Sequence, residues 1–510
     1  MSALPTLSLI VFLPWAGALL LALMPRLGAR GSRATALAFS LSTLALSAVV
    51  LGSFNPATAG YQLAELHDWI PSLNVHFSLG LDGLSLILVL LTAIIGPAGL
   101  LASWRQERDP RLMGIFFLVL QGSALGVFLA LDFVPWFMFW ELSLVPAYFL
   151  IKLWGGPGAP RAAYQFVVYT IGGSAFMLMG FAAIFLTTGT LDFPELSRLA
   201  ADGTLASKLA TLGGFWPHAV FLGVFLGLAV KVPLFPFHSW LPSAYAEAPV
   251  GASMFLTGVM SKMGVYGFLR ILWPLFPAPL HAASPCLIWL AVAGVVFGAF
   301  AAMKQSDLKR MVAYSSINHV SYCLLALFAV SLVTRPGGSA ATSALAGALL
   351  QMFNHGVSAA ALFFCVGVLE SRSGGRRGLG DFGGVRTAAP IFAGFCGISL
   401  FSSLGLPGLN GFVGEFLIFR GVWGLAPWCT AVACLGLFAT AFFLLTFWQR
   451  VFHGPRAGAA AGAFSDLSRL EIATLVPLVA LMFLFGVLPQ LLTGLFNPLV
   501  AAWVGHLPLP

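Results

Sequence analysis

Four charged side chains lie inside stretches of this chain that are otherwise apolar enough to cross a membrane. Two are basic, Lys231 and Lys262, and two are acidic, Glu141 and Glu415. Each belongs to a segment of about twenty mostly apolar residues, which is long enough to span a hydrocarbon core of roughly 30 Å. A charge at that depth costs about 2.5–3.5 kcal/mol on insertion scales. Four such charges predict a buried pathway for charge, and proton transfer is the chemistry that we expect there.

Two later segments place polar side chains at helical spacing on an apolar background. In each, the polar residues are spaced i, i+3, i+4 and i+7: Ser315, Asn318, His319 and Tyr322, then Gln351, Asn354, His355 and Ser358. Such a set forms one stripe along a helix and must face the interior of a bundle. Histidine ordinarily titrates near neutral pH, which suits proton relay. Hydrogen bonding between neighbouring helices is the alternative use of these stripes.

A third polar edge accompanies Lys262. Ser253, Thr257 and Ser261 recur every four residues, so they mark one edge of a helix that could hold water beside the lysine. Snorkelling of Lys262 to an interface is the alternative, but its position in the middle of the segment argues against it.

We expect Glu141 and Lys231 to pair and thereby to control when the lysine releases its proton. At about 4 Å and an effective dielectric of about 20, a unit pair is worth about 4 kcal/mol. That energy equals about a thousandfold change in proton affinity. A purely structural ion pair is the alternative for Glu141. The predicted proton carriers form one lateral row: Glu141, Lys231, Lys262, His319, His355 and Glu415.

Three further ionisable residues lie near the ends of apolar segments. His238 follows two prolines, and we expect it to link the row to the cytoplasmic surface; a loop histidine at the headgroup level is the alternative. Asp82 and Asp132 stand at the ends of spans and are predicted to be interfacial.

Composition identifies the class of protein. The chain has 510 residues, of which 59% are hydrophobic and only 8% charged, which indicates a polytopic membrane protein rather than a soluble one. The net charge of +8 comes from basic residues scattered singly through short loops, so it does not point to nucleic acid. The six cysteines contain no CxxC pair, which argues against iron–sulfur, haem or zinc ligation. We therefore expect no metal or cofactor in this chain.

Hydropathy predicts an all-α fold of about fourteen transmembrane helices. The expected spans cover residues 4–24, 34–53, 82–103, 112–132, 133–154, 164–187, 216–234, 250–273, 284–303, 311–333, 340–369, 388–418, 426–448 and 472–492. With this count, eighteen of the lysines and arginines fall toward one side of the membrane and five toward the other, Lys231 and Lys262 being left out. The richer side is expected to be cytoplasmic, which places both termini on the periplasmic side.

Two of these spans should be broken. Pro233 and Pro236 follow Lys231, and Pro407 and Gly408 precede Glu415. Proline removes a helical hydrogen bond, and unwound backbone is tolerated in a membrane only where protein or water satisfies it. The broken spans are the seventh and the twelfth, and this odd offset is typical of inverted repeats. We expect an N-terminal three-helix segment (1–111), two inverted five-helix repeats (112–280 and 281–450), and a C-terminal loop with a last helix (451–510).

The polar motifs resemble those of a known family. The segments FMFWELSLVPAYFLIKLWGG, AVKVPLFPFHSWLP, SKMGVYGFLRI, DLKRMVAYSSINHVSY, NHGVSAAALFF and LPGLNGFVGEFLI are similar to the antiporter-like subunits of respiratory complex I, over roughly residues 80–450. M-type members of that family resemble this sequence in carrying glutamate at the position of Glu415. Many relatives carry aspartate where this chain has Ser243, so the resemblance implies no role for a loop acid there. The chain also ends soon after its last predicted span, without the long lateral helix of L-type subunits.

The resemblance implies a proton-translocating subunit of an NADH:quinone oxidoreductase in a bacterial inner membrane. In such a complex, NADH, FMN, iron–sulfur clusters and quinone bind to partner subunits, and the neighbours of this chain are other antiporter-like membrane subunits and lipid. The resemblance assigns proton translocation to the row residues, Glu141, Lys231, Lys262, His319, His355 and Glu415. Two alternatives stay open: a subunit of a multisubunit cation/proton antiporter or of a membrane hydrogenase, and a passive scaffold subunit.

Overall fold

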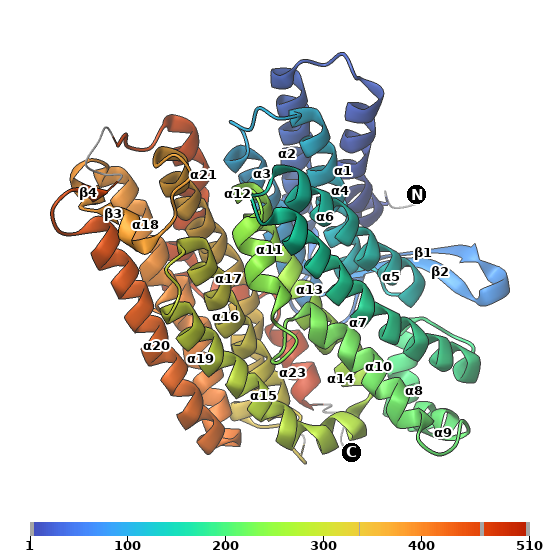
Figure 1. Ribbon diagram of the computed structural model, residues 1–510. Coiled ribbons are helices and arrows are strands. Elements are labelled where there is room, and N and C mark those ends of the chain that lie inside the picture. The colour runs from blue at the N-terminus through green and yellow to red at the C-terminus, as the bar shows by residue number, and fades with distance from the viewer. Residues whose placement is uncertain (1–4, 336, 459–463, 506–510) are drawn as a thin grey trace.

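Long helices lie side by side in one bundle, and a two-stranded hairpin projects from one flank (Figure 1). The computed structural model describes residues 5–335, 337–458 and 464–505. Within these ranges, eleven helical segments are long and apolar enough to cross a membrane. They are α1 (Thr6–Leu23), α2 (Ala29–Ser53), α3 (Gly83–Ala102), α4 (Pro110–Leu129), α5 with α6 (Phe133–Leu142 and Leu144–Trp154), α7 (Ala159–Thr188), α15 (Pro277–Met303), α16 (Leu308–Val330), α17 (Ser339–Arg372), α20 (Pro427–Phe452) and α21 (Arg469–Val487).

The other three predicted spans, 216–234, 250–273 and 388–418, are built from shorter pieces. The first contains α10 (Trp216–Lys231), and α11 (Trp240–Glu247) follows beyond its predicted end. The second contains α12 (Val250–Phe255), η2 (Leu256–Met260), α13 (Ser261–Gly267), η3 (Phe268–Leu272) and α14 (Trp273–Leu275), and the third contains α18 (Pro390–Ser403) and α19 (Asn410–Leu425). The predicted breaks after Lys231 and before Glu415 are therefore confirmed, whereas the count of fourteen stays a prediction.

The breaks have different local causes. After α10 the chain turns through Pro233 and Pro236, which cannot donate the backbone hydrogen bonds that would continue a helix. Between α18 and α19, Gly405 and Gly408 have φ angles of +78° and +93°, a left-handed conformation that residues with a Cβ rarely adopt.

The 250–273 span is interrupted in a way that was not predicted. The segments η2 and η3 are single π-helical turns on either side of α13. Isolated π turns inside α-helices often mark functional sites, because they leave backbone carbonyls without their usual partners. Lys262 is the second residue of α13, directly after the first π turn.

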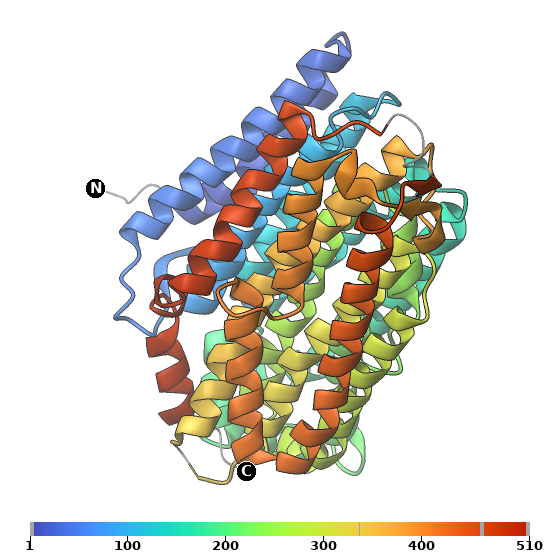
Figure 2. The same ribbon diagram turned by 90° about the vertical axis from the view of Figure 1, so that its left-hand side faces the viewer.

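Helices α16 and α17 form the centre of the bundle. Nearly every residue of their membrane-crossing stretches is buried, whereas α1, α2 and α21 expose most of their surface. Figure 2 shows α1 and α2, in blue, on the outside of the bundle. The two polar stripes that were predicted to face the bundle interior therefore do so, and this places His319 and His355 in the core.

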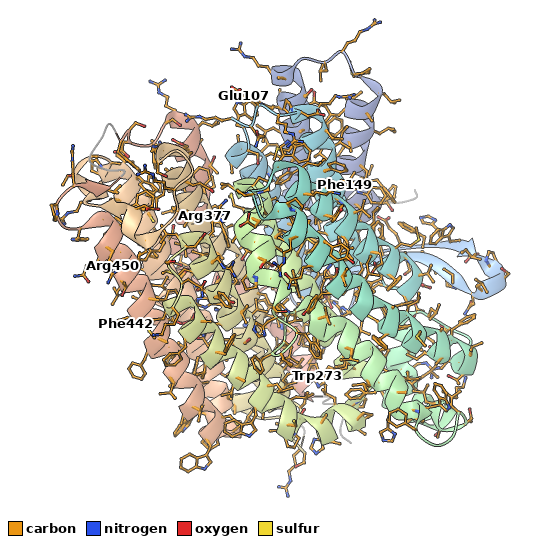
Figure 3. The ribbon with its side chains drawn as sticks, in the orientation of Figure 1. Glu107, Phe149, Trp273, Arg377, Phe442 and Arg450 are labelled. Carbon is orange, nitrogen blue, oxygen red and sulfur yellow. The ribbon has the colours of Figure 1, made fainter. Side chains whose placement is uncertain are left out.

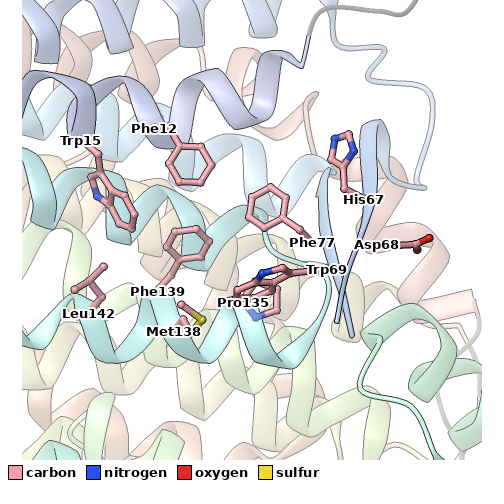
Figure 4. Close-up of a pocket in the computed structure, with 10 residues that line it drawn as sticks. All are labelled: Phe12, Trp15, His67, Asp68, Trp69, Phe77, Pro135, Met138, Phe139 and Leu142. Carbon is pink, nitrogen blue, oxygen red and sulfur yellow. The ribbon is translucent and has the colours of Figure 1, made fainter. Parts of the chain in front are cut away.

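The hairpin was not expected from the sequence. Strand β1 (Gln62–Ile70) pairs antiparallel with β2 (Val75–Leu81) across the short helix η1 (Pro71–Leu73). The Glu65 carboxylate accepts hydrogen bonds from the backbone N–H groups of Leu7 and Ser8, at 2.7 and 3.1 Å, so the hairpin caps the start of α1. The hairpin, α1 and α5 surround an apolar pocket of about 410 Å³ (Figure 4).

Smaller elements complete the described chain. They are α8 (Phe193–Ala201), α9 (Thr204–Ala210), η4 (Leu379–Asp381), β3 (Phe382–Gly383), η5 (Val385–Thr387), β4 (Ala457–Gly458), α22 (Gln490–Thr493) and α23 (Asn497–Gly505). Strands β3 and β4 pair antiparallel and join the loops before α18 and after α20.

Side chains from the predicted basic side meet at one end of the bundle, which we call the basic end. Arg33 donates to the carbonyl of Gln106 at 2.7 Å, and Arg372 pairs with Glu471 at 2.8 Å. Arg377 lies at this end together with Glu107 (Figure 3). Loops that are far apart in the sequence thus share one end, as the distribution of lysine and arginine predicted.

Asp82 and Asp132 stand at the starts of α3 and α5, as their predicted positions at span ends require, but both are covered by protein. Asp82 is 1% exposed and Asp132 is fully buried. Arg270 holds Asp82 at 2.6 Å, and its guanidinium also donates to Tyr61 at 2.9 Å. Asp132 accepts from the backbone N–H groups of Val134 and of His76 on the hairpin. The hairpin covers both carboxylates, and nothing in the hydropathy pattern indicated that cover.

Candidate functional site

Lys262 is enclosed at the centre of the bundle and makes three polar contacts. Its Nζ donates to the carbonyl of Thr257 at 2.7 Å and to Ser261 Oγ at 3.2 Å, and it lies 2.8 Å from Nδ1 of His355. A lysine ammonium carries three donors and no acceptor. The three contacts therefore fit a protonated Lys262 that donates to a neutral His355, whose own proton is then on Nε2.

The contacts continue from His355 to Glu415. The rings of His355 and His319 lie 5.1 Å apart between centroids, and His319 Nδ1 is 3.0 Å from Oε1 of Glu415. Gln351 Nε2 lies 3.3 Å from the same Glu415 oxygen. Four residues from α13, α17, α16 and α19 thus follow one another in contact. We call Lys262, His355, His319 and Glu415 the inner relay.

The inner relay is surrounded by buried polar atoms without a hydrogen-bond partner in the described protein. They are Nε2 of His319, Nε2 of His355, the hydroxyl of Tyr322, Oε1 of Gln351 and Oδ1 of Asn318. Buried polar atoms of this kind are ordinarily satisfied by ordered water. The site therefore suits bound water rather than dry packing.

Lys231 and Glu141 lie apart from the inner relay. Lys231 ends α10, is 3% exposed, and its Nζ stands 4.9 Å from the ring centroid of Trp140. Neither Lys231 Nζ nor Glu141 Oε1 makes a hydrogen bond, and no ion pair within 4.0 Å joins the two among the described residues. The direct pair that we predicted is thus open in this structure, and a cation–π contact with Trp140 takes its place.

The predicted row is therefore divided in two. Within the described ranges, no hydrogen bond or ion pair joins Lys231 to Lys262. Val232 packs against Gly264, where a Cβ would collide with the backbone of Val232. This close apolar contact fills the space between the break after α10 and helix α13.

Aromatic side chains surround His238, and its predicted link to the cytoplasmic surface stays a prediction. Its ring stacks on Phe235 at 5.2 Å and meets Phe297 edge-on at 4.9 Å, so aromatic side chains enclose it. Its Nδ1 is buried without a hydrogen-bond partner in the described chain. Among the described residues, no hydrogen bond or ion pair joins His238 to a row residue.

Glu141 and Glu415 each line a cavity, and the two cavities lie on opposite flanks of the bundle. Glu141 lines an apolar cavity of about 670 Å³ with residues of α5, α6 and α7, and Glu415 lines another of about 500 Å³ with residues of α19 and α20. Figure 1 places α5 and α7 on one flank of the bundle and α19 and α20 on the other. Glu141 and Glu415 therefore stand near opposite flanks of the bundle, and a continuous row between them stays a prediction.

Trp140, whose ring makes the cation–π contact with Lys231, was not among the residues predicted from the sequence. Its indole N–H donates to Ser174 Oγ at 3.0 Å, which fixes the ring. The signal was present, because Trp140 directly precedes Glu141, but a tryptophan in an apolar span has many structural uses.

Comparison with known proteins decides the family. A family model described as "NADH:quinone oxidoreductase/Mrp antiporter, TM" matches residues 130–442. The chain belongs to this family. Every member of the predicted row lies inside the matched region, as does His238.

Members of the family align with this chain over nearly its whole length. It is 35% identical to NADH-quinone oxidoreductase subunit M of Rhodobacter capsulatus, covering 97% of this chain and 95% of that one. It is also 35% identical to F(420)H(2) dehydrogenase subunit M of Methanosarcina mazei, with 88% of each chain covered. A chain of respiratory complex I from Thermus thermophilus with bound NADH superimposes with a TM-score of 0.85 at 30% identity, covering 98% and 99%.

Proposed function

We propose that this chain is the proton-translocating M-type subunit of an NADH:quinone oxidoreductase in a bacterial inner membrane. The basic end faces the cytoplasm, and both termini lie on the periplasmic side. Other membrane subunits of the complex, including further antiporter-like subunits, are its neighbours. The segment boundaries 112–280 and 281–450 delimit its two repeats.

The observation that carries this proposal is the inner relay. Its four residues follow one another in space inside the bundle: Lys262, His355, His319 and Glu415. Each is more than 90% buried. Burying a charged group in such surroundings costs free energy, and such groups are retained in membrane proteins chiefly where they move ions or protons. A structural ion pair involves two residues, whereas the inner relay joins four residues from four helical segments.

Proton transfer along the relay follows from its atoms. Lys262 gives a proton to His355 Nδ1 and becomes a neutral amine, and His355 releases its own Nε2 proton toward His319. His319 takes that proton on Nε2 and releases the one on Nδ1 to Glu415. Each imidazole accepts on one nitrogen and donates from the other, so one proton moves the length of the relay.

Glu141 and Lys231 form the control point in this proposal. Closing the open pair would stabilise the charged lysine by about 4 kcal/mol at an effective dielectric near 20. Trp140 holds the lysine in the open arrangement. A movement in a neighbouring subunit that reaches the cavity beside Glu141 can therefore change the proton affinity of Lys231.

The redox reaction belongs to partner subunits. NADH, FMN, iron–sulfur clusters and quinone bind outside this chain, which couples their chemistry to proton movement through its conformation. The relatives include a subunit of an F(420)H(2) dehydrogenase at the same identity, so the electron donor is a property of the complex.

A cation/proton antiporter subunit is the second candidate, because the matching family also includes Mrp antiporters. Hard cations such as sodium bind through oxygen ligands, whereas three of the four inner-relay groups present nitrogen. The relay therefore favours protons. Proton movement that requires sodium would instead favour the antiporter.

The test uses the complex purified in mild detergent and reconstituted into liposomes. Lys262→Met should lower the number of protons moved per electron while the subunits that copurify stay the same. Lys152→Met is the matched control, since Lys152 is exposed near the basic end and its Nζ donates to the hydroxyl of Tyr148. An unchanged proton-to-electron ratio in an assembled Lys262→Met complex would reject the relay.

A further inference from the structure

A polar cavity of about 450 Å³ opens at the basic end, between the two repeats. Three of its charged side chains come from three helices: Glu247 from α11, Lys309 from α16 and Glu370 from α17. Lys309 and Glu370 form an ion pair of 2.7 Å, and Lys309 also donates to the carbonyl of Ala248 at 3.3 Å. This cavity combines charge with open access, unlike the apolar cavities on the flanks.

Arg377 forms ion pairs with the carboxylates at the rim of this cavity. Its guanidinium contacts Glu247 at 2.8 Å, Asp307 at 2.6 Å and Glu370 at 3.8 Å. It also donates to the carbonyl of Ala246 at 2.8 Å. One arginine thus holds acids from both repeats at the rim of the cavity.

A row of hydroxyl groups descends from the floor of the cavity. Ser253 Oγ donates to the carbonyls of Tyr245 and Ala248, at 2.8 and 3.1 Å, and Ala248 is the same carbonyl that Lys309 contacts. Thr257 Oγ1 lies 2.8 Å from Ser316 Oγ. Ser261 Oγ donates to the Thr257 carbonyl at 2.8 Å. We call Ser253, Thr257 and Ser261 the hydroxyl ladder.

The hydroxyl ladder ends on Lys262, whose Nζ donates to Ser261 Oγ and to the Thr257 carbonyl. Successive members are four residues apart and lie on α12, on the π turn η2 and on α13. Water is the group that can join one hydroxyl to the next, through hydrogen bonds of about 2.8 Å. Each hydroxyl that donates to a carbonyl keeps lone pairs that can accept from such a water.

We propose that this cavity is a proton uptake site for the inner relay, separate from Lys231, and that the hydroxyl ladder conducts the proton from Glu370 to Lys262. This inference rests on the proposed function. It is argued from the geometry, because no hydrogen bond or ion pair joins the relay to Lys231 in the described chain, whereas Ser253, Thr257 and Ser261 stand between Lys262 and the cavity at the basic end.

The proton balance of the uptake is simple. A hydronium ion in the cavity protonates the Glu370 carboxylate and leaves a water molecule. Glu370 passes the proton to the water at Ser253, and each hydroxyl of the ladder accepts one proton and gives up another. Lys262, neutral after its transfer to His355, takes the proton at the end. Lys309 keeps its own proton and holds Glu370 in place.

The first test compares pumping in reconstituted complexes. Glu370→Gln and Thr257→Val should each lower the proton-to-electron ratio by the same amount as Lys262→Met. Thr170→Val is the control, because Thr170 is equally buried and donates to a carbonyl four residues earlier, but lies on α7, away from the route. A normal ratio in both route variants, with a low ratio in Lys262→Met, would overturn the uptake site and leave the relay intact. A normal ratio in all three variants would overturn the relay itself.

The second test measures water access without pumping. Ser253→Cys should react with a water-soluble cationic thiol reagent added from the side of the basic end. Ser284→Cys should not, because Ser284 is equally buried and bonds to the Leu280 carbonyl on α15. The native complex, in which this chain has its own six cysteines, supplies the background. Equal labelling of the two variants would contradict the uptake site, even if both assemble normally.

Discussion

His319 Nδ1 and Glu415 Oε1 lie 3.0 Å apart, in a contact between the continuous helix α16 and the second half of a broken one. The break before α19 positions this carboxylate, because Gly405 lies close enough that a Cβ there would contact Glu415 Oε2. The relay thus ends beside unwound backbone, where a small movement of α19 would separate the imidazole from the acid.

Removing the charge at Glu415 should slow the relay. A glutamine amide cannot take the proton that His319 releases, and the variant also loses a hydrogen bond to a charged group worth about 1.5–3 kcal/mol, so Glu415→Gln should slow the final transfer by at least about tenfold. The slower transfer is measured as the rate of proton pumping by the reconstituted complex. Glu107→Gln is the control, since Glu107 is exposed in a loop at the basic end.

Removing the Trp140 ring should let Lys231 close on Glu141. A cation–π contact of this kind is worth about 0.5–2 kcal/mol, and Trp140→Leu abolishes it. The coupling free energy between Glu141 and Lys231, from a double-mutant cycle on thermal unfolding, should rise in that background.

Trp428→Leu, on the exposed end of α20, should leave the Glu141–Lys231 coupling as it is in the native chain. Identical coupling with and without the Trp140 ring would show that the ring does not hold the pair open.

Breaking the Arg270–Asp82 pair should destabilise the chain. Arg270→Leu leaves the Asp82 carboxylate buried without its partner, which typically costs about 3–5 kcal/mol. Thermal unfolding of the detergent-extracted chain measures the loss. Arg198→Leu should have little effect, because the ion pairs of Arg198 are exposed. Adding Asp82→Asn to Arg270→Leu should restore part of the stability, and a double variant no better than the single one would argue against an orphaned charge.

A side chain at Gly264 should disturb the contact between the first break and α13. In Gly264→Ala the new methyl group meets the backbone and side chain of Val232, and overpacking of this kind costs about 1–3 kcal/mol. Gly172→Ala is the control, since nothing lies within 4 Å of that position on α7. Equal unfolding temperatures for the two variants would mean that the contact has room to relax.

The sequence predicted the parts of the fold that depend on periodicity. Helix ranges, the two breaks, the buried stripes on α16 and α17 and the basic end all follow from apolar length, proline, glycine and the distribution of charge. The hairpin carries only short, weakly alternating strands, and its partners are Leu7, Ser8 and Asp132, which are distant in the sequence. Such long-range partners cannot be read from a local pattern.

The sequence predicted the candidate residues of the site but not the contacts between them. The spacing of His319 and His355 showed that both face inward, yet the contact of His355 with Lys262 depends on how α13 rotates after a π turn. Likewise, the charges of Glu141 and Lys231 suggested a closed pair, whereas the aromatic ring of Trp140 competes for the lysine. Rotation and competition are tertiary effects, and sequence spacing does not contain them.

The most direct test of the inner relay compares two single variants with their combination. Lys262→Met, Glu415→Gln and the double variant are reconstituted, and protons moved per electron are counted in each. If the two residues act in series on one path, the double variant loses no more than the more impaired single variant. Losses that add, or a ratio equal to that of the native complex in either single variant, would contradict a single path from Lys262 to Glu415.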